Sequence, residues 1–174
     1  MKTFEELLAM VPEDYKHFYT FKESKWTDKK KQKMVELANK LYEAGAINPL
    51  SWARSEVGEN IPQFGRFLVL KNLIDVAQNT KYGIEDAAMF GDDVKEKAEK
   101  ISTLLGDDSF KDFLQAYGRA VILNVITILD EGNSNMEQDG VSWYLSETDG
   151  EGEPTGRIIE ALHEDFYEFN ENEG

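Results

Sequence analysis

The sequence predicts a mostly α-helical, multi-helix single domain that ends in a β-hairpin, an α+β fold by strict count. Apolar residues recur at helical spacing in six to eight segments of residues 1–132. Capping residues, glycines and prolines separate these segments. Beyond residue 132, apolar and polar residues alternate as in a half-buried strand. We therefore expect a helical core over 1–132, with an acidic hairpin and short helix over 133–174 packed on the same core.

The helical segments each have a start or stop signal. Thr3 and Glu6 have the spacing of a capping box, and the helix that they begin should end near Pro12, where a second one starts. Thr27 should cap a long helix that ends before Gly45. Further helices are expected over 49–57, 62–78, 84–90, 92–105 and 110–130. The last of these is apolar nearly all round in its second half, which predicts the central, buried helix.

Two predicted helices carry a glycine in a similar setting, Phe64-Gly65-Arg66 and Tyr117-Gly118-Arg119. A glycine inside a helix costs about 1 kcal/mol relative to alanine, so each needs a physical reason. Close approach of a neighbouring helix or side chain is the reason that we expect. Duplication of a helical unit and convergent core packing both account for the repeat, and convergence is the simpler account.

The C-terminal segment predicts a hairpin. Val141, Trp143 and Leu145 alternate with polar or amphipathic residues, which indicates the first strand. Residues 149–156 hold three glycines, a proline and three acids, which is typical of a turn. Residues 157–159 can return as the second strand, and a final short helix is expected over 162–169.

The net charge of −15 is concentrated at the C-terminal end. Residues 1–129 contain 20 acidic and 18 basic residues, whereas residues 130–174 contain 14 acidic residues and one basic residue, Arg157. A negative field of this size repels polyanions, so we expect no nucleic-acid partner. The longest apolar run, 120–129, is too short for a bilayer, and Glu5 and Glu6 interrupt any secretion signal. We expect no membrane partner and a cytoplasmic location.

Motifs for catalysis are missing from the sequence. It has no cysteine, no nucleophile-elbow serine, no phosphate-binding glycine loop and no EF-hand pattern. We therefore expect no cofactor and assign no catalytic residue. One alternative stays open, a metal-dependent hydrolase centred on His163, Glu164 and Asp165 with Asp130 as a further ligand, because imidazole and carboxylate groups bind divalent metals.

The acidic C-terminal segment also carries aromatic residues, and aromatic anchors ringed by charge are typical of protein interfaces. The candidate partner-binding residues are Trp143, Tyr144, Glu147, Asp149, Glu151, Glu153, Glu164 and Tyr167. In size, charge and aromatic content the chain resembles the small acidic immunity proteins that neutralise basic toxic enzymes. The resemblance implies a non-enzymatic, immunity- or inhibitor-like module that recognises a basic protein. A surface that only aids solubility and a self-associating structural or regulatory subunit are the other interpretations.

Overall fold

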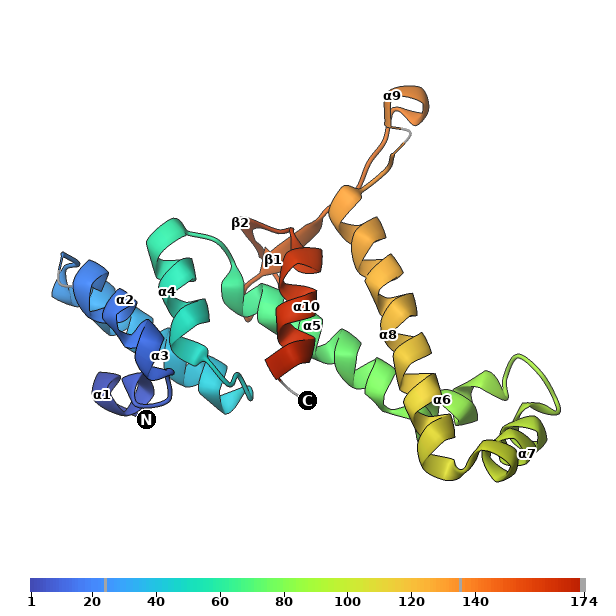
Figure 1. The fold of residues 1–174 in the computed structure, drawn as a ribbon. Coiled ribbons are helices and arrows are strands. Elements are labelled where there is room, and N and C mark those ends of the chain that lie inside the picture. Colours follow the sequence, from blue (N-terminus) through green and yellow to red (C-terminus); the bar gives the residue numbers. More distant parts are fainter. Residues whose placement is uncertain (24, 135, 173–174) are drawn as a thin grey trace. The chain divides into compact units, whose positions relative to one another are not determined.

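The computed structural model describes residues 1–23, 25–134 and 136–172 (Figure 1). Most of these residues are helical, and a two-stranded antiparallel sheet lies near the C-terminus, which confirms the predicted fold class. In chain order the elements are α1 (Phe4–Leu8), α2 (Glu13–Glu23), α3 (Asp28–Glu43), α4 (Pro49–Glu59), α5 (Gln63–Gln78), α6 (Thr80–Ala87), α7 (Val94–Leu105), α8 (Asp107–Glu131), α9 (Met136–Asp139), β1 (Leu145–Thr148), β2 (Pro154–Ile159) and α10 (Leu162–Asn172).

The chain forms two compact units. The first unit combines residues 1–68 with residues 144–174, and the second unit comprises residues 69–143. The boundary falls within α5, after Leu68. The first unit therefore brings the N-terminal helices together with the hairpin and the last helix, which are far apart in sequence.

The first unit has an apolar core built on α3 and α4, which pack against each other. The capping box at Thr3 is present, with Glu6 accepting from the Thr3 backbone N–H and donating its own N–H to the Thr3 hydroxyl. Thr27 caps α3 as predicted, through a hydrogen bond from the Lys30 N–H. The fully buried side chains of these helices include Leu7 from α1, Met34, Ala38 and Leu41 from α3, and Pro49, Leu50 and Ala53 from α4.

Helix α10 packs against the first unit through one apolar face. Leu162, Phe166 and Phe169 are buried, and their spacing of four and then three residues places them on one side of the helix. The ring of Phe169 lies 5.3 Å from that of Phe67 on α5, centroid to centroid. The predicted helix over 162–169 is therefore present, and its buried face contacts α5.

The hairpin begins later than the sequence predicts. Strand β1 starts at Leu145, which pairs with Ile159, whereas residues 141–144 belong to no strand. The prediction of a strand from Val141 was wrong because other groups hold this segment. The Trp143 Nε1–H donates to the Ile128 carbonyl at the end of α8, and the Asn133 carboxamide donates to the Val141 carbonyl. The predicted turn lies between the two strands, at 149–153.

Both helical glycines lie at close contacts, as predicted. A Cβ atom at Gly65 would be 3.1 Å from Cδ1 of Ile159 on β2. A Cβ atom at Gly118 would be 3.1 Å from the backbone carbonyl oxygen of Ala77, where α8 meets the C-terminal part of α5. The Gln115 side chain also donates to the Gln78 carbonyl at this crossing. Packing therefore accounts for both glycines.

Helix α8 is less buried than its sequence predicts. Only Phe110, Ile122 and Ile126 are buried along its 25 residues, while Phe113 and Tyr117 are exposed. The expectation of a central, fully covered helix was therefore wrong. Among the described helices of the second unit, α6, α7 and the C-terminal part of α5 pack on α8, and several of its apolar side chains stay exposed.

Among the described residues, α8 is also the one helix that is long and apolar enough to cross a membrane. This statement rests on length and composition alone, and the core helix of a globular protein meets the same test. The helix begins with Asp107 and Asp108 and ends with Asp130 and Glu131. The cytoplasmic location inferred from the sequence stays a prediction.

Candidate functional site

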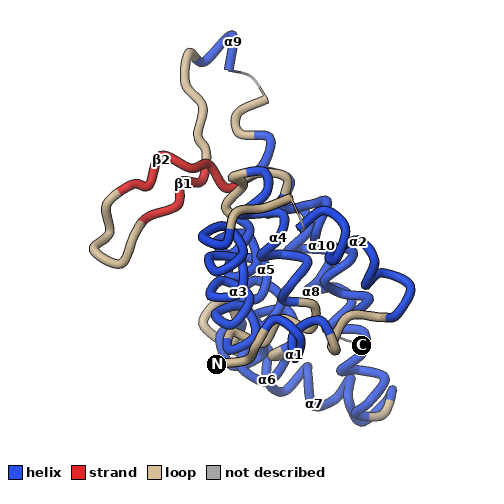
Figure 2. The backbone as a smooth tube through the Cα atoms, turned by 90° about the vertical axis from the view of Figure 1, so that its left-hand side faces the viewer, coloured by secondary structure: helices blue, strands red, loops and turns tan. Residues whose placement is uncertain are grey.

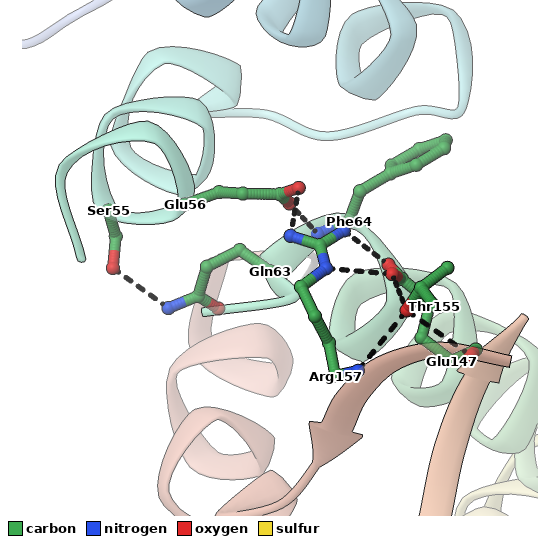
Figure 3. A network of polar contacts seen from close by, with 7 residues as sticks. All are labelled: Ser55, Glu56, Gln63, Phe64, Glu147, Thr155 and Arg157. Carbon is green, nitrogen blue, oxygen red and sulfur yellow. Dashed lines mark hydrogen bonds and ion pairs between the residues drawn. The ribbon is translucent and has the colours of Figure 1, made fainter. Parts of the chain in front are cut away.

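The hairpin is joined to the helices of the first unit by an arginine that binds two glutamates (Figure 3). The Arg157 Nε and Nη2 atoms donate to the two carboxylate oxygens of Glu147, at 2.8 and 2.7 Å. The Nη1 atom donates to Oε1 of Glu56 on α4, at 2.8 Å. Bidentate pairing of this kind fixes both the position and the plane of the guanidinium. We call the three residues the Arg157 clamp.

The second oxygen of Glu56 is also bonded. It accepts the Phe64 backbone N–H at 2.8 Å, which is one of the N–H groups that α5 cannot pair within its first turn. The Glu56 side chain is 6% exposed and that of Arg157 is 25% exposed. Burial alone would lower the pKa of Arg157, but the hydrogen bonds to Glu56 and Glu147 outweigh it and raise the pKa. The guanidinium is therefore charged, and the two glutamates hold it in place.

The clamp determines which charges the C-terminal segment presents. Arg157 is the only basic residue in residues 130–174, and its side chain points toward α4 (Figure 3). Among the described residues, no ion pair involves Glu151, Glu153, Glu160 or Glu164, all of which are exposed. The outer surface of this segment is consequently acidic and uncompensated.

The hairpin turn has an ordered backbone. The Asp149 carboxylate accepts the backbone N–H groups of Glu151 and Glu153, at 2.9 and 3.0 Å. Asp149 thus holds the turn, while the side chains of Glu151 and Glu153 are exposed. In Figure 2 the turn extends away from the helices that pack on the hairpin's base. The two glutamates are therefore presented on a projecting, defined loop.

The two faces of the hairpin differ. Leu145, Glu147, Arg157 and Ile159 are partly or fully buried, whereas Tyr144, Ser146 and Ile158 are exposed. Ser146 and Ile158 are paired across the strands, so they lie on the same, outer face. The outer face thus carries the exposed aliphatic side chain of Ile158, and the exposed ring of Tyr144 directly precedes β1.

Helix α10 presents a second acidic and aromatic surface. Glu164 and Tyr167 are exposed and three residues apart, which places them on the same side of the helix. A largely buried ion pair lies at the start of this helix. Arg66 on α5 pairs with the Asp165 carboxylate at 2.6 Å and donates a hydrogen bond to the Ala161 carbonyl, also at 2.6 Å. The positions of Glu164 and Tyr167 on the first unit are therefore well defined.

The structure separates the candidate residues named from the sequence. Tyr144, Glu151, Glu153, Glu164 and Tyr167 are exposed side chains of the first unit. Glu147 belongs to the Arg157 clamp and Asp149 holds the turn, so both have structural partners. Trp143 lies in the second unit, half exposed, with its indole N–H bonded to the end of α8.

The residues of the alternative metal site are also placed. Asp165 is ion-paired with Arg66, and His163 is an exposed residue of α10. Within residues 1–23, 25–134 and 136–172, no group of three or more histidine and carboxylate side chains is arranged to hold a metal ion. The geometry of the described residues therefore gives the hydrolase alternative no support.

Sequence reasoning missed Glu56 and Arg66, which hold the hairpin and α10 in place. One signal was available for the first of them. A single arginine within 45 residues that hold 14 acids is expected to have a dedicated carboxylate partner. No feature of the sequence identifies that partner as a residue 101 positions away.

Comparison of the chain with protein-family models, curated proteins and solved structures gives no match.

Proposed function

We propose that this chain is a non-enzymatic, acidic protein-binding module, immunity- or inhibitor-like, whose first unit recognises a basic protein. One observation carries the proposal. The only cation of the C-terminal segment is turned inward by Glu56 and Glu147, while Glu151, Glu153, Glu160 and Glu164 are exposed without an ion pair among the described residues. Uncompensated like charges destabilise a folded chain, so their retention on an ordered surface favours a role in recognition.

The expected mechanism is electrostatic steering followed by docking. A negative surface raises the rate of encounter with a cationic partner by about one to three orders of magnitude at low ionic strength. Charges on a projecting turn contribute strongly to this encounter rate, because an approaching partner comes close to them first. The exposed rings of Tyr144 and Tyr167 would then supply buried contact area, since tyrosine is enriched among the residues that dominate binding energy.

A basic peptide can stand in for the protein partner in a first test of the proposal. We expect an arginine- and lysine-rich peptide of about 20 residues to associate rapidly at about 50 mM salt and about tenfold more slowly when Glu151→Lys and Glu153→Lys are combined. Steering depends on local charge, so the reduction should fall on the association rate rather than the dissociation rate. Surface plasmon resonance measures both rates. A high-pI protein captured from the source organism is then measured in the same way.

A matched control separates a specific surface from overall acidity. Asp86 and Asp92 are exposed acids of the second unit that form no ion pair with any described residue, so Asp86→Lys combined with Asp92→Lys changes the net charge equally. The control should alter the association rate less than about twofold. Equal slowing by both double variants would show that only the net charge matters, and the proposed site would be wrong.

Self-association is a second candidate, favoured by the surface of the second unit. Phe113, Tyr117 and Val121 are exposed and follow one another at four-residue spacing on α8, so they form one apolar stripe. Exposed apolar patches on globular domains commonly mark interaction sites. Light scattering at micromolar concentration tests this candidate: a mass of two chains that Tyr117→Glu reduces to one would support it, and a single-chain mass would exclude it.

A further inference from the structure

Helix α8 carries a row of exposed apolar side chains apart from its buried ones. Ile122 and Ile126 are buried. Tyr117, Val121 and Ile128 are 63%, 42% and 57% exposed. They belong to a set that follows α8 at alternating steps of three and four residues, which we call the α8 seam: Leu114, Tyr117, Val121, Asn124 and Ile128. Steps of three and four give the period with which one helix packs along another, so the seam has the spacing of a helix-pairing surface.

The exposed apolar surface around the seam has the size of a small interface. Phe113 and Val125 border the seam and are also exposed. A whole aromatic side chain has about 150–250 Å² of surface, so the exposed apolar area of the seam and its borders is on the order of 500 Å². A specific interface buries about 500 Å² or more on each partner, whereas an obligate dimer buries about 1,000 Å² or more on each. The area therefore fits a separate partner better than a permanent second copy.

A groove lies at the N-terminal end of the seam. It has a volume of about 630 Å³ and is lined by α6, α7 and the first turns of α8, all in the second unit. Leu114 of the seam lines it together with the buried Phe110. Ile84 and Ala98 from the other two helices add apolar lining. Helices that bind in grooves insert apolar side chains at places of this kind, so the groove extends the apolar surface of the seam.

Both ends of the seam are acidic. Continued at the same spacing, the seam reaches Asp107 at one end and Glu131 at the other, and both are exposed without an ion pair to a described residue. The first six residues of α8 hold three acids and one lysine, and its last two residues are both acids. Acids in the last turn oppose the helix macrodipole, and no basic residue of that turn offsets them.

These charges indicate what covers the seam. Basic residues of a partner would offset the acids at each end, whereas an anionic surface would be repelled. Two copies of α8 would bring acidic ends together in either orientation, parallel or antiparallel. Charge and area therefore both favour a different, cationic chain over a second copy.

We infer that the α8 seam binds an α-helix of a partner protein whose apolar stripe is flanked by basic residues at both ends. From Leu114 to Ile128 the seam is about 21 Å long, so about four turns of the partner helix would pack on it. Basic side chains beyond these turns would lie near Asp107 and Glu131. The inference concerns the second unit and does not rest on the function proposed for the first.

Synthetic peptides test the seam on the full chain. The probe is a fluorescein-labelled helical peptide of about 22 residues with leucine at seam-facing positions and two lysines at each end. A second peptide has glutamate in place of these lysines, and a third keeps the lysines but has its leucines scrambled. Fluorescence anisotropy should show saturable binding of the first peptide, about tenfold weaker binding of the second and no saturation by the third. Equal binding of the first peptide and either of the others would overturn the inference.

Two tyrosines of equal exposure provide a matched pair of variants. Tyr117 lies in the seam and is 63% exposed, while Tyr82 on α6 is 61% exposed and does not line the groove. Tyr117→Ser should weaken binding of the lysine-ended peptide by about fivefold or more, because aromatic side chains dominate binding energy. Tyr82→Ser should change it by less than about twofold. Equal weakening by both substitutions would contradict the assignment of the seam.

A charge reversal at the end of the seam tests the flanking acids. Glu131→Lys should fold, because a cation in the last turn of a helix favours its macrodipole. It should weaken the lysine-ended peptide by about threefold and strengthen the glutamate-ended peptide by a similar factor. Asp86→Lys on α6 changes the net charge equally and should alter both affinities by less than about twofold. Equal effects of the two reversals would show that only net charge matters, and the assigned partner chemistry would be wrong.

Three results would identify a different occupant or site, and each would overturn the inference. Light scattering that gives two chains for the protein and one for Tyr117→Ser would place a second copy on the seam. Sedimentation with phosphatidylcholine vesicles that Tyr117→Ser abolishes would place a membrane there. A loss of about tenfold in peptide affinity on combining Glu151→Lys with Glu153→Lys would show that the peptide binds the acidic turn. That last result would leave the proposed function standing, so the failures of the two proposals are distinguishable.

Discussion

Removal of the Arg157 guanidinium should uncouple the hairpin from the helices of the first unit. The Arg157→Met variant keeps the aliphatic bulk of the side chain but removes three hydrogen bonds, two to Glu147 and one to Glu56. It leaves two carboxylates, with side chains 14% and 6% exposed, without their cation. The hydrogen bond from Phe64 to Glu56 does not involve Arg157 and should persist.

The expected loss of stability is about 3 kcal/mol. Removing one partner of a buried ion pair costs about 3–5 kcal/mol, mainly because the other charge stays buried. Water reaches part of the Arg157 side chain, so the lower end of that range applies. Most of the cost therefore arises from the two carboxylates left behind rather than from lost attraction.

Urea unfolding followed by tryptophan fluorescence measures the change, because the Trp52 ring packs edge-on against the buried Phe67 in the first unit. Amide hydrogen exchange locates it, and exchange should accelerate in β1 and β2. Lys97→Met is the matched control. It also removes one positive charge, but from an exposed i,i+4 pair with Asp93, and should change the stability by about 0.5 kcal/mol or less.

Neutralising Glu56 and Glu147 tests whether their unpaired charges cause the loss of stability in Arg157→Met. Combining Arg157→Met with Glu56→Gln and Glu147→Gln should recover about 1–2 kcal/mol, because no buried charge then lacks a partner. If Arg157→Met costs no more than Lys97→Met, the clamp does not stabilise the hairpin. If the triple variant is less stable than the single one, the unpaired carboxylates are not the source of the cost. Either result would refute the reasoning.

Three further outcomes follow from single contacts. Gly83→Ala should stabilise the folded protein by up to about 1 kcal/mol, because the added Cβ would meet open space. Gly118→Ala should be at least about 1 kcal/mol less favourable than Gly83→Ala, because its Cβ would press on the Ala77 backbone. Urea unfolding measures both. Arg66→Met should destabilise by about 3 kcal/mol and accelerate amide exchange in α10, because Asp165 loses its buried partner. The hydrogen bond from the Thr3 backbone N–H lowers the pKa of the Glu6 carboxyl. The stabilisation of the folded state by this carboxylate is therefore fully present above the ordinary glutamate pKa and is lost as the pH falls through the lowered value. NMR titration of this carboxyl should show the lowered pKa.

The Arg157 clamp also bears on the proposed recognition surface. Because the arginine is used internally, the acids of the turn gain no intramolecular cation from their own segment. Reversal of Glu151 or Glu153 should therefore alter binding with little effect on folding, since both side chains are exposed. Substitution of Glu147 would alter both, so it is unsuitable as a binding test.

The local structure was largely predictable from the sequence. Helix starts at Thr3 and Thr27 depend on groups within three residues, and the hairpin turn depends on Asp149 and on Gly152, whose φ is positive. Close packing at Gly65 and Gly118 was also predictable, because an interior glycine that lowers helix stability requires a compensating contact. These inferences rest on short-range rules that each segment obeys by itself.

Only the tertiary structure decided which side chains are free. Glu147 and Glu151 are both acids of one hairpin, yet the first is bound to Arg157 and the second is exposed. The burial of α8 was wrongly predicted because it also depends on tertiary contacts. An apolar pattern shows which faces of a helix are apolar, but it does not show which elements cover those faces. Partners such as Glu56 and Arg157 are 101 positions apart, and their pairing depends on how the chain folds back on itself. Composition determines the total charge, whereas the fold determines where each charge can act.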